Sequence, residues 1–208
     1  LSSGTAFGDH ATWAEGLGGN LGRNHLYLVG DVTGDGLADL TAVSRIFGDW
    51  RALVYELTGT SFEEGAPFRD SLRGDHDNIM LTDADGDGRA DFVASKVRGD
   101  SDTIVFWDLW LSSGCSRQDR PPSCFGEPQQ WVTGAGDAGD LFRVGDGNGD
   151  GLADLFYARP RGMTSLTNPP DLSQIRWYGR LAIAWPRPVL GDLTTWASDA
   201  GNEGDIFP

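Results

Sequence analysis

The chain has 208 residues, of which 39% are hydrophobic and 23% are charged, and this composition supports one folded domain and argues against disorder throughout. Acidic residues outnumber basic ones by 31 to 16 and give a formal net charge of -15, which disfavours nucleic acid as a partner and favours cations. No apolar run reaches the roughly 18 residues that a membrane-spanning helix needs, so we expect no membrane span. The 30 glycines, with many aspartates beside them, favour turns over helices and indicate a chain rich in β-structure.

A repeat sets the order of the predicted elements along the chain. Nine-residue segments of one pattern begin at Asp31, Asp83 and Asp146, so successive copies start 52 and 63 residues apart. Spacing of this kind is typical of solenoids, propellers and arrays. We predict a single repeat region over 1–208, with a partial unit at 1–24, units at 25–76, 77–139 and 140–204, and the start of a further unit at 205–208.

Each unit contains short apolar runs with the alternation that is typical of strands. In unit 25–76 we expect strands at 26–29, 40–43, 51–57 and 61–68. In unit 77–139 we expect them at 79–81, 92–94 and 104–111. In unit 140–204 we expect them at 141–144, 155–158 and 180–185.

About four short strands in a unit of this length are typical of the blade of a β-propeller. We therefore predict an all-β fold, an arc of about four units with four-stranded antiparallel blades. Neither end of the sequence coincides with a unit boundary. The arc is expected to belong to a larger propeller, and to be stable when it is held against the rest of that propeller or against a second copy, because an open arc exposes apolar faces and strand edges.

The nine-residue segments have the composition of calcium loops. Positions 1, 3, 5 and 9 carry side-chain oxygens, position 7 can offer a backbone carbonyl, and Gly at position 6 permits a sharp turn. Asp-Gly-Asp-Gly is also ordinary turn chemistry, but three copies at one phase favour a metal site. An EF-hand or dockerin loop is excluded, because the twelfth positions are Ala42, Ala94 and Tyr157 and strand-forming residues follow each loop.

These loops, followed by strands and preceded by aromatic residues, resemble the FG-GAP/VCBS repeats. That family includes integrin α-subunit propellers, fungal propeller lectins, and propeller modules of secreted bacterial enzymes and toxins. The resemblance implies three calcium ions and a secreted or cell-surface location. The first ion would be bound by Asp31, Thr33, Asp35 and Asp39 with the carbonyl of Leu37. The second would be bound by Asp83, Asp85, Asp87 and Asp91 with the carbonyl of Arg89, and the third by Asp146, Asn148, Asp150 and Asp154 with the carbonyl of Leu152.

Both cysteines, Cys115 and Cys124, lie in an insert between 111 and 125. We expect them to form a disulfide, which fits an oxidising compartment. A zinc site would need two more soft ligands nearby, and the surrounding sequence has none. We also expect the bridged loop to lie on the surface, within one unit, and to be independent of the calcium loops.

Catalytic motifs are missing from the sequence: it has no Gly-x-Ser-x-Gly, His-Glu-x-x-His or phosphate-loop pattern. A glycosidase-type carboxylate pair could be drawn from Asp49, Glu56, Asp75 and Asp108, but nothing singles out one pair. Arg-Gly-Asp triplets begin at Arg73 and Arg98, and the abundance of Arg, Gly and Asp in turns explains them. We expect no catalysis by this chain.

Five tryptophans lie on or beside the predicted third strands, and flat indole rings stack well on sugars. The candidates for sugar contact are Trp50, Trp107, Trp110, Trp177 and Trp185, with packing between blades as the alternative. We therefore expect a calcium-stabilised extracellular module that binds or scaffolds, with a glycan or a cell-surface protein as its partner. The alternative is the non-catalytic propeller portion of a larger secreted enzyme or toxin.

Overall fold

The computed structural model describes residues 12–15, 17, 25–46, 49–67, 76–98, 104–115, 124–137, 139–161, 171–183 and 189–198. Within these ranges the chain forms twelve strands and no helix. The described segments accordingly offer no helix of the length and hydropathy needed to cross a membrane. The predicted all-β class is confirmed for this part of the chain.

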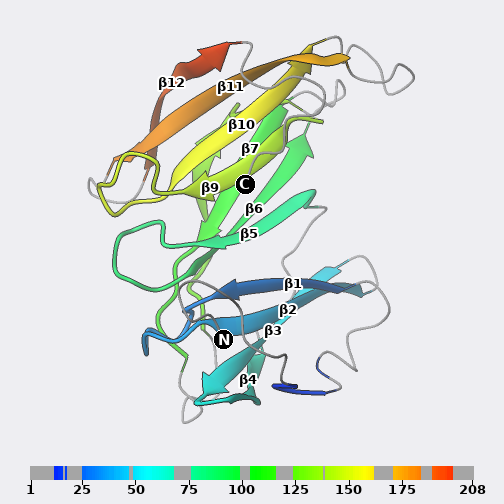
Figure 1. The fold of residues 1–208 in the computed structure, drawn as a ribbon, viewed down its shortest axis with the longest axis vertical. Coiled ribbons are helices and arrows are strands. Elements are labelled where there is room, and N and C mark those ends of the chain that lie inside the picture. The colour runs from blue at the N-terminus through cyan, green and yellow to red at the C-terminus, as the bar shows by residue number, and fades with distance from the viewer. Residues whose placement is uncertain are drawn as a thin grey trace, which may run out of the picture.

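The twelve strands form three four-stranded antiparallel sheets, and each sheet is built from four consecutive strands (Figure 1). The first sheet contains β1 (His25–Gly30), β2 (Asp39–Ile46), β3 (Asp49–Thr58) and β4 (Ser61–Pro67). The second sheet contains β5 (Asn78–Thr82), β6 (Asp91–Arg98), β7 (Ile104–Trp110) and β8 (Gln129–Thr133). The third sheet contains β9 (Leu141–Gly145), β10 (Asp154–Arg161), β11 (Asp171–Ile183) and β12 (Val189–Ser198).

Each nine-residue segment connects the first strand of a sheet to the second. The ninth residue of the segment is the first residue of the second strand, and it pairs with the last residue of the first strand. These pairs are Gly30 with Asp39, Thr82 with Asp91, and Gly145 with Asp154. The same hairpin register therefore occurs in all three sheets, and it places the three segments at equivalent positions.

The strands predicted from apolar alternation are confirmed wherever the structure describes them. The run expected at 61–68 is the strand β4, and its pairing with β3 has a register shift between Leu53 and Tyr55. Two strands had not been placed, β8 and β12, and β11 begins at Asp171 rather than near 180. The partial units at 1–24 and 205–208 lie largely outside the described residues.

The first and second sheets pack face to face through one apolar core. Val43 and Val54 from the first sheet meet Phe92, Ala94 and Trp110 from the second, and all five are buried. Side chains alternate along a strand, so Phe92 and Ala94 of β6 point to this core while the residue between them points to the opposite face. Complete burial of a side chain of this size contributes about 1.5–3 kcal/mol, so the interface is a substantial part of the stability.

A second apolar core joins the second and third sheets. Val93 and Trp107 from the second sheet meet Phe142, Leu155 and Tyr157 from the third. The rings of Trp107 and Phe142 make an edge-to-face contact at 5.1 Å between centroids, a favourable geometry for aromatic pairs. In Figure 1 the three sheets consequently follow one another as a stack, and β1 contacts β5 while β5 contacts β9.

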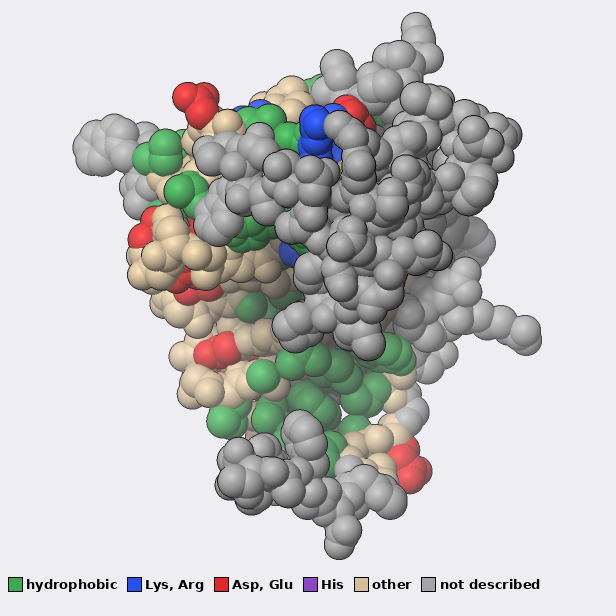
Figure 2. Space-filling model, turned by 45° about the horizontal axis from the view of Figure 1, so that its top comes forward, with side chains coloured by type: hydrophobic (Ala, Val, Ile, Leu, Met, Phe, Trp, Pro, Cys, Tyr) green, Lys and Arg blue, Asp and Glu red, His purple; other side chains and the backbone are tan. Residues whose placement is uncertain are grey.

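Exposed apolar side chains concentrate on the two outer sheets. Among the described residues, every large apolar side chain that is exposed belongs to the first or the third sheet or to the first loop: Leu26, Tyr27, Val29, Leu37, Leu141, Ile183, Val189 and Leu193. Figure 2 shows apolar side chains gathered in the lower half of the view, in the part of the molecule that carries the first sheet. The second sheet is covered on both faces, so it contributes none of them.

Candidate metal sites

Two glycines in each segment allow the backbone to coil. Gly34 and Gly36 of the first loop (31–39) have φ of 80° and 84°. The equivalent glycines of the second loop (83–91) and of the third loop (146–154) have φ between 79° and 89°. This left-handed region is readily adopted only by glycine, so the Gly-x-Gly spacing is what lets nine residues turn back toward their own side chains.

The first aspartate of each loop lies at the centre of this turn. Asp31 accepts hydrogen bonds from the backbone N–H groups of Gly34 at 2.6 Å, Asp35 at 3.2 Å and Gly36 at 2.8 Å. Asp83 and Asp146 accept the same three bonds in their own loops. Hydrogen bonds to a carboxylate are stronger than neutral ones, so this residue organises the loop whether or not a cation is present.

The ninth aspartate ties each loop to its sheet. Asp39, Asp91 and Asp154 are all fully buried. One oxygen of each accepts from the second residue of its own loop, Val32, Ala84 or Gly147. The other oxygen accepts from a backbone N–H on or directly after the third strand, that of Leu57, Ser112 or Ala182. The loop is therefore held against the sheet by a buried carboxylate.

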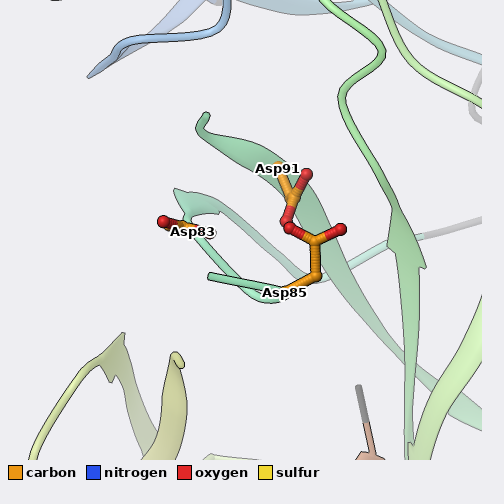
Figure 3. A group of neighbouring side chains, drawn as sticks. All are labelled: Asp83, Asp85 and Asp91. Atoms are coloured by element: carbon orange, nitrogen blue, oxygen red, sulfur yellow. The ribbon is translucent and has the colours of Figure 1, made fainter. Parts of the chain in front are cut away.

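In the second loop three carboxylates converge. Ligand oxygens of Asp83, Asp85 and Asp91 all lie within 4.8 Å of one another. Figure 3 shows the carboxylates of Asp85 and Asp91 facing each other, with Asp83 to one side. Asp87 stands apart from this group because it pairs with the guanidinium of Arg89. Across the residues that the structure describes, no other group of three acidic, histidine or cysteine ligands comes this close together.

The anionic forms of these carboxylates are unfavourable where they lie. Burial, together with the charges of Asp85 and Asp87, raises the pKa of Asp91 to about 7. Burial and the charge of Asp87 also raise the pKa of Asp85. A divalent cation among these oxygens would neutralise the repulsion and replace the lost hydration, so the arrangement fits a hard, oxygen-ligated ion such as calcium.

The first and third loops have the same backbone but fewer acidic groups. Thr33 and Asn148 occupy the third position, where the second loop has Asp85. Burial raises the pKa of Asp39, whereas the hydrogen bonds from Gly151 and its neighbours lower the pKa of Asp146. Among the described residues the three-carboxylate geometry is thus specific to the second loop, and the ligand roles inferred for all three loops stay predictions.

The loops lie side by side. The backbone N–H of Ala90 donates to the carbonyl of Asp31 at 2.6 Å, which joins the second loop to the first. A Cβ added to Gly34 would stand 2.9 Å from the side chain of Arg89, and one added to Gly86 would stand 3.1 Å from the side chain of Leu152. The second and third loops therefore each place their seventh residue against the fourth residue of the preceding loop.

Cys115 and Cys124 form a disulfide with their Cα atoms 4.3 Å apart, as predicted. The described ends of the insert are not independent of the rest of the fold, contrary to the expectation, and residues 116–123 lie outside the described residues. Cys124 is fully buried in the core between the first and second sheets. These ends are joined by an isolated bridge between Ser112 and Phe125, and Phe125 also packs in that core.

Ser112 connects the insert to the first and second loops. Its N–H donates to Asp91 at 2.7 Å, and its hydroxyl donates to the carbonyl of Val32 in the first loop at 2.7 Å. Its own carbonyl accepts from the guanidinium of Arg89 at 3.2 Å. Ser112, at the start of the insert, thus contacts both the first and the second loop. The sequence around Ser112 did not predict this position.

The tryptophans predicted to contact sugar are mostly packing residues. Trp107 is 0% and Trp110 is 5% exposed, in the two cores, so neither can offer its ring face to a ligand and the prediction is wrong for both. Trp50 and Trp177 are half-buried, and Trp185 lies outside the described residues. Large aromatic side chains at these positions are explained by packing, because they fill the space between one sheet and the next.

A buried polar cluster in the second sheet escaped the sequence analysis. Asp108, one of the carboxylates considered for catalysis, pairs with Lys96, and His76 lies 3.8 Å from it. Burial by itself would raise the pKa of Asp108, but the contacts with His76 and Lys96 outweigh it and lower the pKa. An ionised carboxylate held by a lysine has the features of a structural ion pair. The Arg-Gly-Asp triplets extend outside the described residues.

The loops are alike in three properties: two left-handed glycines, a first aspartate that collects backbone N–H groups, and a buried ninth aspartate. Their assignment depends on this geometry and on the spacing of the repeat. The chain matches no family model, no curated protein and no solved structure.

Proposed function

We propose that this chain is a calcium-stabilised arc of β-propeller blades of the FG-GAP/VCBS type, and that it works outside the cell as a binding or scaffolding module. The observation that carries the proposal is the recurrence of one hydrogen-bonded loop at the same hairpin of three successive sheets. Turn chemistry alone does not require a buried ninth carboxylate, nor a three-carboxylate cluster with a raised pKa. A cation-binding role accounts for both.

Calcium is the cation that suits these loops best. The side chains offered are carboxylates, an amide and a hydroxyl, which are hard oxygen ligands, and the described loops contain no histidine or cysteine. Magnesium demands near-ideal octahedral geometry, whereas calcium accepts the irregular ligand sets of flexible loops. Three calcium ions would add six positive charges to a chain whose formal net charge is -15.

The stacking of the sheets supports the blade arrangement. Each sheet is a four-stranded meander, the first strands are neighbours in the order β1, β5, β9, and the loops lie side by side at one end of these strands. β8 also contacts β12, so the second and third sheets meet at their fourth strands as well. Blades that radiate from an axis have their first strands closest together and large side chains between neighbouring faces.

An extracellular location is supported by the disulfide, which is rare in reducing compartments. Loops of modest charge bind calcium in the range of about 0.1–1 mM that is typical of extracellular modules. Calcium would then be a permanent structural component in that location. The function follows from the rigid surface that such an arc presents, and we assign no catalytic step to it.

Calcium titration by calorimetry of the chelator-treated protein tests the proposal. We expect binding to three sites, with the strongest lost in Asp85→Ala, because that substitution removes one of the converging carboxylates and leaves the first and ninth aspartates in place. Asp192→Ala, which removes an exposed aspartate of β12 outside the loops, is the matched control and should keep all three sites. Absence of binding at about 2 mM calcium would overturn the proposal, because extracellular modules are saturated near that concentration.

A further inference from the structure

The loop-on-loop contact of this chain is directional. We define the knob of a loop as its seventh and eighth residues, and the socket as its fourth residue together with the residue before the loop. The knob of the second loop, Arg89 and Ala90, lies against the socket of the first, Gly34 and Gly30. A Cβ on Gly30 would stand 2.7 Å from the Cβ of Ala90, so the fit leaves no room for a side chain in this socket.

The same contact recurs between the second and third loops. The knob of the third loop is Leu152 and Ala153, and both are buried, at 8% and 1% exposure. A Cβ on Gly86, in the socket of the second loop, would meet Leu152 at 3.1 Å and the carbonyl of Gly151 at 3.2 Å. The residue before the second loop is Thr82 rather than glycine, so the two loop pairs share the contact between the seventh residue of one loop and the fourth residue of the preceding loop.

At the two ends of the row this contact is incomplete. The knob of the first loop is Leu37 and Ala38; Leu37 is 41% exposed and Ala38 is exposed as well, although their equivalents in the third loop are buried. The socket of the third loop is Gly145 and Gly149, and a Cβ added to either would meet no described atom within 4 Å. Among the described residues, the row thus ends in an open knob on one side and an open socket on the other.

We propose that these two ends dock on each other between copies of this chain, with the knob of one copy, Leu37 and Ala38, in the socket of the next, Gly145 and Gly149. The occupant is a second copy, because the chain itself carries both complementary halves and already forms the contact of the seventh residue with the fourth in two loop pairs. Such a head-to-tail contact is heterologous, so it closes into a ring or continues as a filament.

The positions of the exposed apolar side chains agree with a head-to-tail contact between copies. They lie on the first and third sheets, the two outer members of the stack, and none of the exposed large ones in the described ranges lies on the second sheet. Docking of the loops would bring the first sheet of one copy toward the third sheet of another. Exposed apolar surface on those two sheets would then be covered, as it is around the second sheet.

This inference rests on the proposed calcium loops, since both partners in the contact are acidic. Within the chain such loops approach each other closely, and calcium would remove the repulsion between copies in the same way. Self-association is therefore expected with calcium present and lost when it is chelated. Calcium binding and self-association are measured separately, so that failure of one can be told from failure of the other.

The test uses the whole 208-residue chain, light scattering after size-exclusion chromatography, and two blocking variants. Ala38→Asp places a charge on the exposed knob at a residue that offers no calcium ligand. Gly149→Asn adds a side chain to the open socket, and Asn tolerates the left-handed φ of 81° at this position. Gln130→Asp, at an exposed residue of β8 in the second sheet, is the control. Each variant is first shown to retain the calcium-induced rise in melting temperature.

At about 100 μM protein, where an association of micromolar affinity is saturated, the wild type and Gln130→Asp should have at least twice the 22.4 kDa mass of one copy. Ala38→Asp and Gly149→Asn should each be monomeric, because each lacks one half of the contact. An equimolar mixture of the two should form a dimer and stop there, since one intact knob and one intact socket remain between them.

Two results would overturn the proposal. A calcium-binding wild type that stays monomeric would leave the knob and socket to a different partner, or to none. Association that survives in both blocking variants would show that another surface is used. A chain that binds no calcium and remains monomeric would overturn the proposed function together with this inference.

Discussion

The second and third loops share a backbone but differ in their surroundings. In both, the first aspartate accepts three backbone N–H groups and the ninth aspartate is fully buried. The second loop adds a third carboxylate, Asp85, where the third loop has Asn148. It also lies between two other loops and against the disulfide insert, whereas the third loop has the second as its one described loop neighbour.

This difference indicates that copies of one loop motif can differ in how much they gain from a bound cation. The hydrogen bonds within a loop create the turn, and they are the same in each copy. The electrostatic environment comes from neighbouring segments and from the third-position residue. Burial and two nearby carboxylates raise the pKa of Asp91 to about 7, so the second loop has the most to gain from a cation.

Removal of calcium should produce the largest effect, because it acts on all the loops at once. A ligand at 100 times its dissociation constant stabilises by about 2.7 kcal/mol per site, so chelation should lower the melting temperature by at least about 10 °C. Circular dichroism with EDTA, and with calcium restored in excess, measures the change. Overlapping curves with and without EDTA would contradict calcium stabilisation.

Loss of the disulfide should affect the second loop more than the third. Cys115→Ser combined with Cys124→Ser should cost about 2–3 kcal/mol of unfolding free energy, the value expected for a short closed loop. Because Ser112 carries the insert onto the first two loops, calcium affinity should fall there more than at the third loop.

Urea unfolding and calorimetry of the double variant test both parts of this prediction. Reduction of the wild type provides an independent route to the same state. Equal affinity losses at all three sites, or no loss at any, would show that the insert does not support the first two loops selectively.

The pH dependence should reverse between the calcium-free and calcium-bound protein. The pKa of Asp91 lies near 7 in the fold and is ordinarily 3.8, so the metal-free fold binds an extra proton between these values. Its stabilisation is fully present below about pH 4 and is lost as the pH rises through 7, which amounts to roughly 2 kcal/mol between pH 5.5 and 7.5. Bound calcium requires the ionised form, so the bound protein should gain stability over the same interval.

Melting curves at several pH values, with and without EDTA, show this crossing. Asp91→Asn should flatten the profile of the chelated protein, because it removes the titrating group and keeps one acceptor oxygen. A chelated protein that becomes more stable toward pH 7.5 would contradict the origin assigned to the raised pKa.

Exchange of the third-position residues should have the smallest effect of these changes, and it tests directly whether this position sets the calcium affinity. Asn148→Asp should tighten the third loop, and Asp85→Asn should weaken the second, each by about tenfold or 1.4 kcal/mol, because ligand charge tunes calcium affinity. The Thr33 loop should be the weakest of the three. Calorimetry that finds the order unchanged in both variants would mean that the neighbours, rather than the third residue, set the strength.

Local patterns were sufficient for most of the strands and for the loops, whereas β8 and β12 were not predicted. The run Leu40-Thr-Ala-Val43 predicts β2 because alternation along a strand is visible within a few residues. The glycines at positions 4 and 6 predict a coiled turn for the same reason. The predicted disulfide also followed from two cysteines close together in the chain, and it is confirmed.

Contacts between distant segments could not be predicted in this way. Ser112 lies 80 positions from Val32, and no period of the sequence connects them. The insert between 111 and 125 interrupts the repeat, so it looked like a surface loop. Its C-terminal end is nevertheless fixed by Cys124 and Phe125, which are buried in the core between the first and second sheets.

By itself the sequence determined the repeat, the β-class and the three loops, because each is encoded by neighbouring residues with a fixed period. The tertiary structure decided which side chains are available. Trp107 and Trp110 are excluded as ligand platforms because the next sheet covers them, and Asp91 has its raised pKa because distant segments bury it. Whether a side chain is buried depends on what packs against it. In a stack of sheets, the segment that packs against it comes from a different part of the chain.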